Sequence, residues 1–524
     1  MNPKQKSKLG RILPTILIGT SAAFIFLAAA HGQTTNSADA APVKIPADDA
    51  SGSAAGSATV ASTEAAEIET LKKEIQTLDQ KVQKLEQQRE VEQPAVAESN
   101  QEQIQELDQK VRILERRREL DKEAADAAAK TQPKLTLGQN GFSFGSADSN
   151  FIASLHGVIQ ADSRSFINDG GGTAGKNTFL LRRARPIFTG TVFHDFDFNF
   201  TPDFGGSGVV IYDAFLNYRF NSALQVEGGR FKSPVGLESL QTDAWTAFNE
   251  RSLATGLVPN RDIGFELHGD LFAGSVSYAA GIFNGAPDYS TPTAPAQDVD
   301  DNKAFAGRLF FQPWKATSIV PLQGLGFGVG GSYESDRGTA ADLTSGYKTD
   351  GQQSFFTYAG TIANGVHWRI SPQGYYYYGP FSLLGEYVIS DQRVTAGAVS
   401  ANLRNTAWEV TAGWVLTGED ATYNGVTPRH PFDPRAGDWG AWQVVARYAD
   451  LNIDNAAFPT FATAGSASEA KAWSAGVNWY LNRDIRIDAS FSRTTFEGGG
   501  GTAGLGPITR QPENTIFTRV QVAF

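Results

Sequence analysis

The residues of this chain whose chemistry could act on a solute are the charged ones. Many of them recur at every second position of apolar segments. If those segments are strands, alternate residues share one face. Rings of one charge on an inner face make a pore selective, but the two signs are about equal here. The side chains expected on the inner face are Arg183, Arg185, Arg219, Arg308, Arg447, Arg486 and Arg519, with Asp195, Asp197, Asp213, Glu266, Asp270, Glu409 and Asp488.

Catalytic and metal chemistry finds little support in the sequence. The chain has no cysteine, which excludes disulfide scaffolds, zinc–thiolate sites and thiol nucleophiles. The six histidines show no metal-ligand spacing, and no Ser/His/Asp arrangement stands out. The net charge of −11 argues against nucleic acid as a partner. We therefore expect no enzyme, no cofactor and no metal; a hydrolase built on a barrel is the alternative.

The elements that must position these charges are strands. From about residue 134 to Phe524, apolar and polar residues alternate and are punctuated by Gly, Pro, Asn and Asp. In 473–481, for example, Trp473 and Val477 oppose Ser474 and Asn478. The sixteen strands that this pattern predicts lie near 151–166, 177–193, 194–203, 209–220, 223–232, 261–271, 274–284, 302–313, 325–335, 363–379, 381–391, 404–416, 438–451, 472–482, 484–496 and 514–524.

Three features favour a transmembrane barrel over a soluble sandwich. The apolar faces run about 9–11 residues, the length of a tilted transmembrane strand. Aromatic residues crowd the strand ends, and short turns alternate with longer polar connections, as in outer-membrane barrels. The predicted fold class is therefore all-β, a sixteen-stranded antiparallel transmembrane β-barrel preceded by an α-helical coiled-coil segment. A barrel of this size is wide enough for an aqueous channel.

The N-terminal part has a different organisation. Residues 1–30 have a basic start, an apolar run and a small-residue end, and we interpret them as a signal peptide, with an uncleaved anchor as the alternative. Residues 31–63 predict a disordered linker. Residues 64–127 carry two near-repeated heptad stretches, interrupted at Pro94, and predict a coiled coil for oligomerisation. The barrel is expected over 134–524.

Over about residues 140–524 the chain resembles the phosphate-selective porin O/P family. The match rests on the order and spacing of many short motifs. The segments that carry it are Gln160-Ala161-Asp162, Phe179-Leu180-Leu181-Arg182-Arg183-Ala184, Tyr212-Asp213-Ala214, Gly229-Arg230-Phe231, Val235-Gly236-Leu237-Glu238, Glu250-Arg251, Leu416-Thr417-Gly418-Glu419, Gly440-Ala441-Trp442 and Gly476-Val477-Asn478-Trp479-Tyr480.

The resemblance implies a trimeric outer-membrane channel whose pore carries a row of arginines and a phosphate site. Arg182 and Arg183 match an arginine pair of that row, and Asp213 matches an acidic residue of the phosphate site. Strict alternation points Arg182 away from Arg183, so a bulge or a position at the headgroup rim is needed for Arg182. With Arg185, Arg219 and Arg308, these are the predicted pore residues.

The connection 233–260, called the constriction loop below, is expected to fold into the pore. It carries Glu238, Asp243, Glu250 and Arg251. Other positions depart from the family, since Val158 stands where an arginine of the row is expected and Ser239 where a lysine is expected. These departures bear on phosphate selectivity and not on the expected channel fold.

The function that these observations predict is passive diffusion of small anions such as phosphate through a homotrimer embedded in outer-membrane lipid. One alternative is a weakly selective general diffusion porin. Another is a structural envelope protein in which 64–127 contacts the periplasm or cell wall.

Overall fold

The computed structural model describes residues 58–89, 94–129, 131–138, 141–167, 175–206, 208–288, 300–500 and 509–524. The predicted signal peptide and the predicted linker up to residue 57 lie outside these residues. The chain divides into two compact units. The larger holds residues 157–187 and 199–524, and the smaller holds the described residues between 58 and 156 together with 188–198.

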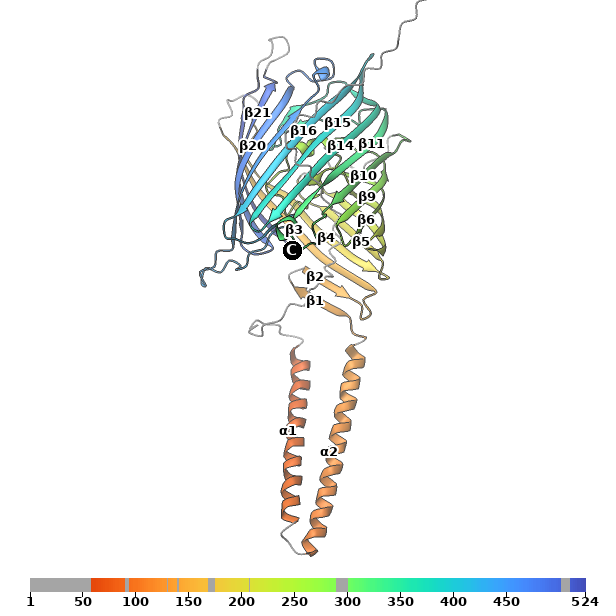
Figure 1. Ribbon diagram of the computed structural model, residues 1–524, viewed down its shortest axis with the longest axis vertical. Helices are drawn as coiled ribbons and strands as arrows, with labels where there is room; N and C mark the ends of the chain where they lie inside the picture. Colours follow the sequence, from red (N-terminus) through yellow and green to blue (C-terminus); the bar gives the residue numbers. More distant parts are fainter. Residues whose placement is uncertain are drawn as a thin grey trace, which may run out of the picture. The chain divides into compact units, whose positions relative to one another are not determined.

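Sixteen antiparallel strands form a closed β-barrel (Figure 1). Closure comes from pairing of the last strand with the first, from Thr515↔Phe166 to Ala523↔Val158. The barrel strands are β3 (Phe151–Phe166), β4 (Thr178–Val192), β5 (Phe196–Asp203), β6 (Val210–Asn221), β7 (Leu224–Lys232), β8 (Arg261–Leu271), β9 (Val276–Phe283), β10 (Ala304–Phe311), β11 (Leu325–Thr339), β14 (Ile362–Tyr378), β15 (Phe381–Ala396), β16 (Val399–Val415), β19 (Ala441–Asn452), β20 (Ala467–Tyr480), β21 (Ile485–Gly498) and β22 (Glu513–Ala523). Each predicted strand is present, so the predicted fold class is confirmed.

The barrel wall is apolar outside and polar inside, the reverse of a soluble protein. On β16, Trp408, Val410 and Trp414 are exposed, whereas Glu409 between them is buried. Aromatic side chains pack together near strand ends, for example the stacked rings of Trp442 and Trp479, whose centroids lie 4.9 Å apart. An outer apolar band with aromatic side chains at its borders suits a lipid environment.

Two details of the predicted strand pattern are wrong. Asp195, predicted on the inner face, lies exposed in the turn between β4 and β5, because the strands end at Val192 and restart at Phe196. The long polar connection predicted over 392–403 is instead a continuation of β15 and β16, which reach Ala396 and Val399. Gly397, with φ of +58°, supplies the left-handed conformation that the tight turn needs.

Several connections pack inside the barrel. The constriction loop contains α3 (Leu237–Leu240) and the short helix η1 (Leu253–Leu257), both largely buried. The 340–361 connection contains the hairpin of β12 (Tyr347–Lys348) and β13 (Ser354–Phe356). Helix η1 packs against β12, β15, β16 and β19. The main apolar core therefore lies between these two connections and the inner wall; its members include Leu253, Leu257, Tyr347, Phe355, Phe356 and Leu403.

The remaining short elements lie in other connections. They are η2 (Val320–Leu322), η3 (Asn455–Ala457) and the hairpin of β17 (Ala421–Thr422) and β18 (Gly425–Val426). The sequence did not predict these elements, because each is only two or three residues long.

In the smaller unit, α1 (Ala58–Arg89) and α2 (Pro94–Ala129) lie side by side (Figure 1). Helix α1 starts inside the segment expected to be a linker. Pro94 is the first residue of α2, a position where its missing N–H costs nothing. Ahead of β3, β1 (Lys134–Gly138) and β2 (Gly141–Gly145) form a hairpin that the sequence did not predict.

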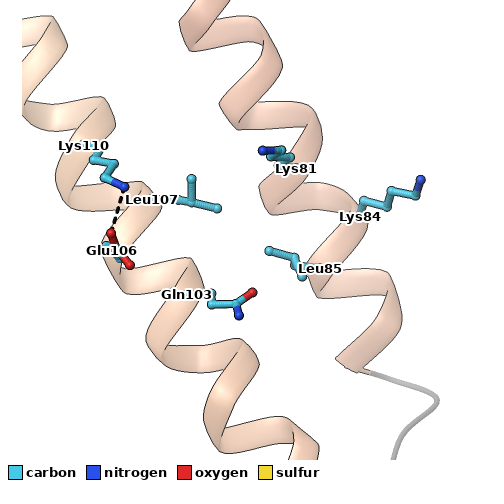
Figure 2. Close-up of a pocket in the computed structure, with 7 residues that line it drawn as sticks. All are labelled: Lys81, Lys84, Leu85, Gln103, Glu106, Leu107 and Lys110. Atoms are coloured by element: carbon cyan, nitrogen blue, oxygen red, sulfur yellow. Dashed lines mark ion pairs between the residues drawn. The ribbon is translucent and has the colours of Figure 1, made fainter.

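The heptad seams of the two helices face each other within one chain. Figure 2 shows Leu85 of α1 and Leu107 of α2 pointing toward one another. Polar residues surround the two leucines. Two of these residues, Lys110 and Glu106, form an ion pair in which Nζ and Oε1 lie 2.8 Å apart. The seam residues remain only half-buried. Among the described residues, no helix is long and apolar enough to cross a membrane.

Candidate constriction site

Strand β4 and the constriction loop bring arginines and carboxylates together. Arg182 forms a two-pronged pair with Glu250, with Nε–Oε1 and Nη2–Oε2 distances of 2.6 and 2.9 Å. Nη2 of Arg164, on β3, lies 3.1 Å from the same carboxylate. Arg185 pairs with both Asp203 and Asp243.

Asp243 is the second centre of this group. Besides Arg185, it pairs with Arg251 of its own loop, and its Oδ2 lies 3.2 Å from Nε of Arg183. Arg183 also donates a hydrogen bond of 2.6 Å to Gln160 on β3. We call this group the arginine network; its members are Arg164, Arg182, Arg183, Arg185 and Arg251 with Asp203, Asp243 and Glu250.

The backbone of β4 is paired irregularly beside Asp203. The Asp203 carboxylate accepts hydrogen bonds from the backbone N–H groups of Ala184 and Gly205, at 3.1 and 2.8 Å. The Asp203 side chain thus accepts a hydrogen bond from the Ala184 N–H, which would donate to a neighbouring strand in regular pairing. Arg182 and Arg183, adjacent in sequence, both meet loop carboxylates, and Arg182 pairs with Glu250 rather than standing at a lipid rim.

The loop carboxylates are strongly held in their charged form. Burial raises the pKa of Glu250, but Arg182, Arg183 and Arg164 outweigh burial and leave this pKa far below its usual value. Burial likewise opposes the charge of Asp243, yet its arginine partners leave the pKa of Asp243 well below normal. Both groups are therefore anionic at neutral pH.

The network has more positive than negative groups. Five guanidinium groups surround three carboxylates. Four of the five arginines are largely buried, whereas the Arg182 side chain is 29% exposed. Of the predicted arginines in this network, Arg182 has the most exposed side chain.

The inner wall also holds the main chain of the constriction loop. Side-chain amides of Gln160, Gln373, Asn478 and Gln521 donate to loop carbonyls at 2.6–3.1 Å. Arg486 donates to another loop carbonyl, that of Thr246, at 3.1 Å. Many of the polar side chains on the inner face therefore fix the path of the loop.

The other predicted residues lie apart from the network. Asp213 forms a two-pronged pair with Arg261, at 2.8 and 3.1 Å. The ring of Tyr212 lies 3.5 Å from the guanidinium carbons of both Arg261 and Arg185, so it spaces two positive charges. Arg219, half-buried, lies toward the C-terminal end of β6.

Two further predicted residues contact side chains of β14 and β19. Arg308 on β10 is buried and donates to Gln373 at 2.9 Å, beside the N-terminal part of the loop. Glu238 accepts from Arg447 at 3.2 Å and also from Ser252 and Thr255 of the loop.

Three charged residues of the site, Arg164, Asp203 and Arg261, were not predicted from the sequence. A signal for Arg164 was present, because Gln160, Asp162 and Arg164 occupy alternate positions of β3. Asp203 ends β5 and Arg261 begins β8, where alternation gives little guidance.

A second buried charge group holds the other inward connections. Arg369 on β14 pairs with Asp288 and Glu334, at 2.6 and 2.9 Å. Tyr347 and Ser390 donate hydroxyl hydrogen bonds to Asp288 at 3.1 and 2.7 Å. Burial raises the pKa of Asp288, but Arg369 and His367 outweigh it and lower this pKa to about 2. This group fixes residues 284–288 and the β12–β13 hairpin rather than offering an open binding site.

Known proteins that are similar to this chain identify its family. Residues 154–498 match the family of phosphate-selective porins O and P. The chain belongs to this family. A curated relative, Porin O of Pseudomonas aeruginosa, is 26% identical over 430 residues, which cover 74% of this chain and 92% of that protein. Family membership confirms the predicted resemblance and makes this chain an outer-membrane porin.

Solved structures with a related fold include two bacterial channels. The outer membrane channel DcaP of Acinetobacter baumannii aligns over 72% of this chain and 98% of its own, with 10% identity and a TM-score of 0.47. An anion-selective porin from Comamonas acidovorans aligns over 71% of this chain and 100% of its own, with 12% identity and a TM-score of 0.41.

Proposed function

We propose that this porin passes small anions by passive diffusion, with phosphate-type solutes favoured, and that it carries out no enzymatic reaction. The observation that supports this most directly is the positive excess of the arginine network beside the constriction loop. A guanidinium group binds phosphate and carboxylate oxygens through paired donors and stays charged at all physiological pH values.

Arg182 is the residue we propose as the first contact for an anion, because its side chain is the most exposed in the network. Arg183, Arg185 and Arg251 would act at longer range, since their side chains are only 5%, 7% and 15% exposed. Asp213, neutralised by Arg261, would set the position of that arginine and of Tyr212 rather than touch the solute.

The test is the reversal potential of the purified protein in a planar bilayer under a KCl gradient, with phosphate added as a competitor. We expect chloride to carry most of the current and phosphate to block it. Arg182→Gln should lower the chloride preference, and Glu250→Gln should raise it. Arg404→Gln is the matched control, because the Arg404 side chain is 60% exposed and pairs with Asp391 outside the network.

A cation-selective current, or equal chloride preference in all variants, would contradict the proposed role of the network. A weak anion preference without phosphate block would support the second candidate, a general diffusion porin. The extensive pairing of inner arginines favours that candidate, as in the pairs Arg519–Asp162 and Arg486–Asp488, with Nε–Oδ1 distances of 2.7 and 2.8 Å.

For the rest of the chain we propose a signal peptide over 1–30, a linker over 31–63, a periplasmic coiled coil over 64–127 and the barrel over 134–524. The half-buried seams of α1 and α2 support further association, and we propose a homotrimer. In the alternative tether role, the helices would contact the periplasm or cell wall.

A further inference from the structure

Three glutamates from distant parts of the chain meet inside the barrel, beside α3. Glu386 on β15 and Glu409 on β16 stand directly opposite each other in the strand register. Glu238 comes from the constriction loop. One carboxylate oxygen from each residue lies within 4.8 Å of the other two, and all three residues are buried, with exposed fractions of 4%, 1% and 4%. We call this group the glutamate triad.

Most oxygens of the triad have hydrogen-bond donors. Glu386 accepts from the backbone N–H groups of Leu237 and Glu238, at 2.8 and 3.3 Å. Both Glu238 oxygens are engaged, one of them by Arg447. Glu409 accepts from the Thr411 hydroxyl through Oε2 at 2.7 Å, but its Oε1 is buried and has no hydrogen-bond partner.

Among the described residues, one arginine forms an ion pair with this group, while Arg251 and Arg308 interact with Glu238 and Glu386 without pairing with their carboxylates. Arg447 lies 3.2 Å from Glu238 but also forms a 3.0 Å pair with Asp350, so its charge is shared. Burial of several carboxylates together is costly unless a cation or a proton compensates for their repulsion. The unpartnered oxygen of Glu409 marks the position where that compensation is missing.

We propose that the glutamate triad binds one divalent cation of the calcium type. Ca²⁺ prefers carboxylate oxygens, accepts six to eight of them in flexible geometry and completes its shell with water. Three carboxylates from a loop and two neighbouring strands meet that preference. The ion would hold the N-terminal part of the constriction loop against β15 and β16, in addition to any role of the pore in solute passage.

The experiment is calorimetric titration of CaCl₂ into the full-length protein, refolded in detergent without lipopolysaccharide and treated with a chelator. We expect one tight site per chain. Glu409→Gln should weaken Ca²⁺ binding about tenfold or more, since metal affinity falls by at least this factor when even supporting groups are lost. Glu266→Gln is the matched control, because Glu266 is a buried inner glutamate on β8 outside the triad.

No stoichiometric binding by the unaltered chain would overturn the proposal and indicate that a shared proton compensates the triad. Retained Ca²⁺ affinity in Glu409→Gln would also overturn it, because the ion would then bind elsewhere. If Glu409→Gln does not fold, Glu238→Gln provides the second variant, since its loop position leaves the strands unchanged. Single-channel recording gives an independent measure: chelation should increase current noise in the unaltered protein and in Glu266→Gln. Equal noise with and without the chelator would contradict a structural ion.

Discussion

The constriction loop meets the barrel wall at two places of opposite character. Near Asp243 and Glu250, each loop carboxylate is surrounded by arginines, and the wall contributes a positive excess. Near Glu238, the loop carboxylate meets two further glutamates and shares one arginine. The first contact is compensated within the protein, whereas the second leaves a buried oxygen without a donor. The same loop is therefore held by charge pairs at one contact and brings three buried carboxylates together at the other.

The contact near Asp243 and Glu250, where arginines neutralise the loop carboxylates, is called the compensated side below. The largest expected effect comes from removing one of these carboxylates. Asp243→Asn should destabilise the folded barrel by about 3–5 kcal/mol, because buried guanidinium groups would lose their partner. Urea titration in lipid vesicles measures this free energy of unfolding. Asp301→Asn is the control, since Asp301 forms a 3.7 Å pair with Arg337 in which both side chains are well exposed. Equal stability of the two variants would show that the Asp243 pairs contribute little.

Acidification should break the compensated side only at very low pH. The pKa values of Asp243 and Glu250 are lowered in the folded state, so their contribution to stability is complete above the ordinary carboxyl pKa of about 4. It is lost as the pH falls through the lower, folded-state pKa values. We expect the difference in stability between the unaltered protein and Asp243→Asn to stay constant from neutral pH down to the ordinary carboxyl range. Urea titrations across this range test it, and a loss of the difference near pH 6 would contradict the assignment.

A smaller effect should follow from removing the aromatic spacer of the compensated side. Tyr212→Leu should destabilise the protein by about 1–2 kcal/mol, because the ring contacts two guanidinium groups, those of Arg185 and Arg261. Tyr212→Phe keeps the ring face and should retain most of the stability. If both variants lose the same stability, the hydroxyl group rather than the ring face would be the important contact.

The smallest effect on conduction should come from the smaller unit. Deletion of residues 64–127 is expected to leave single-channel conductance and reversal potential unchanged, since no residue of the constriction site lies there. Planar-bilayer recording tests this, and envelope permeability in cells tests the alternative tether role. A changed reversal potential would mean that the helices contribute to the solute path.

The strands and their order could be predicted because alternation is a local signal that every transmembrane strand must carry. The prediction was wrong where alternation ran on past the end of a strand and where small residues gave a weak signal. Asp195 continues the alternation in sequence but lies in a turn, and the stretch Ala396–Ala401 contains small residues that suit a loop as well as a strand.

The site was less predictable, because its contacts join residues that are distant in sequence. The two-pronged pair of Arg182 with Glu250 depends on the loop path and on Asp203, which no spacing in the sequence reveals. Glu386 belongs to no recognisable sequence motif, and its place in a carboxylate cluster is visible only in the structure, beside Glu409 and Glu238. The solute-binding roles of Arg182, Arg183, Arg185, Asp213, Arg219 and Arg308 remain predictions.

The hydrogen bonds from the wall to the constriction loop have a consequence for how such a pore can diversify. Gln160, Gln373, Asn478 and Gln521 bind main-chain carbonyls, which every amino acid possesses. Substitutions at loop positions that keep the backbone path therefore leave these anchors intact. Loop side chains other than those paired with the wall can therefore vary while the wall stays constant, so a new solute preference can evolve, or be engineered, by changing the loop alone.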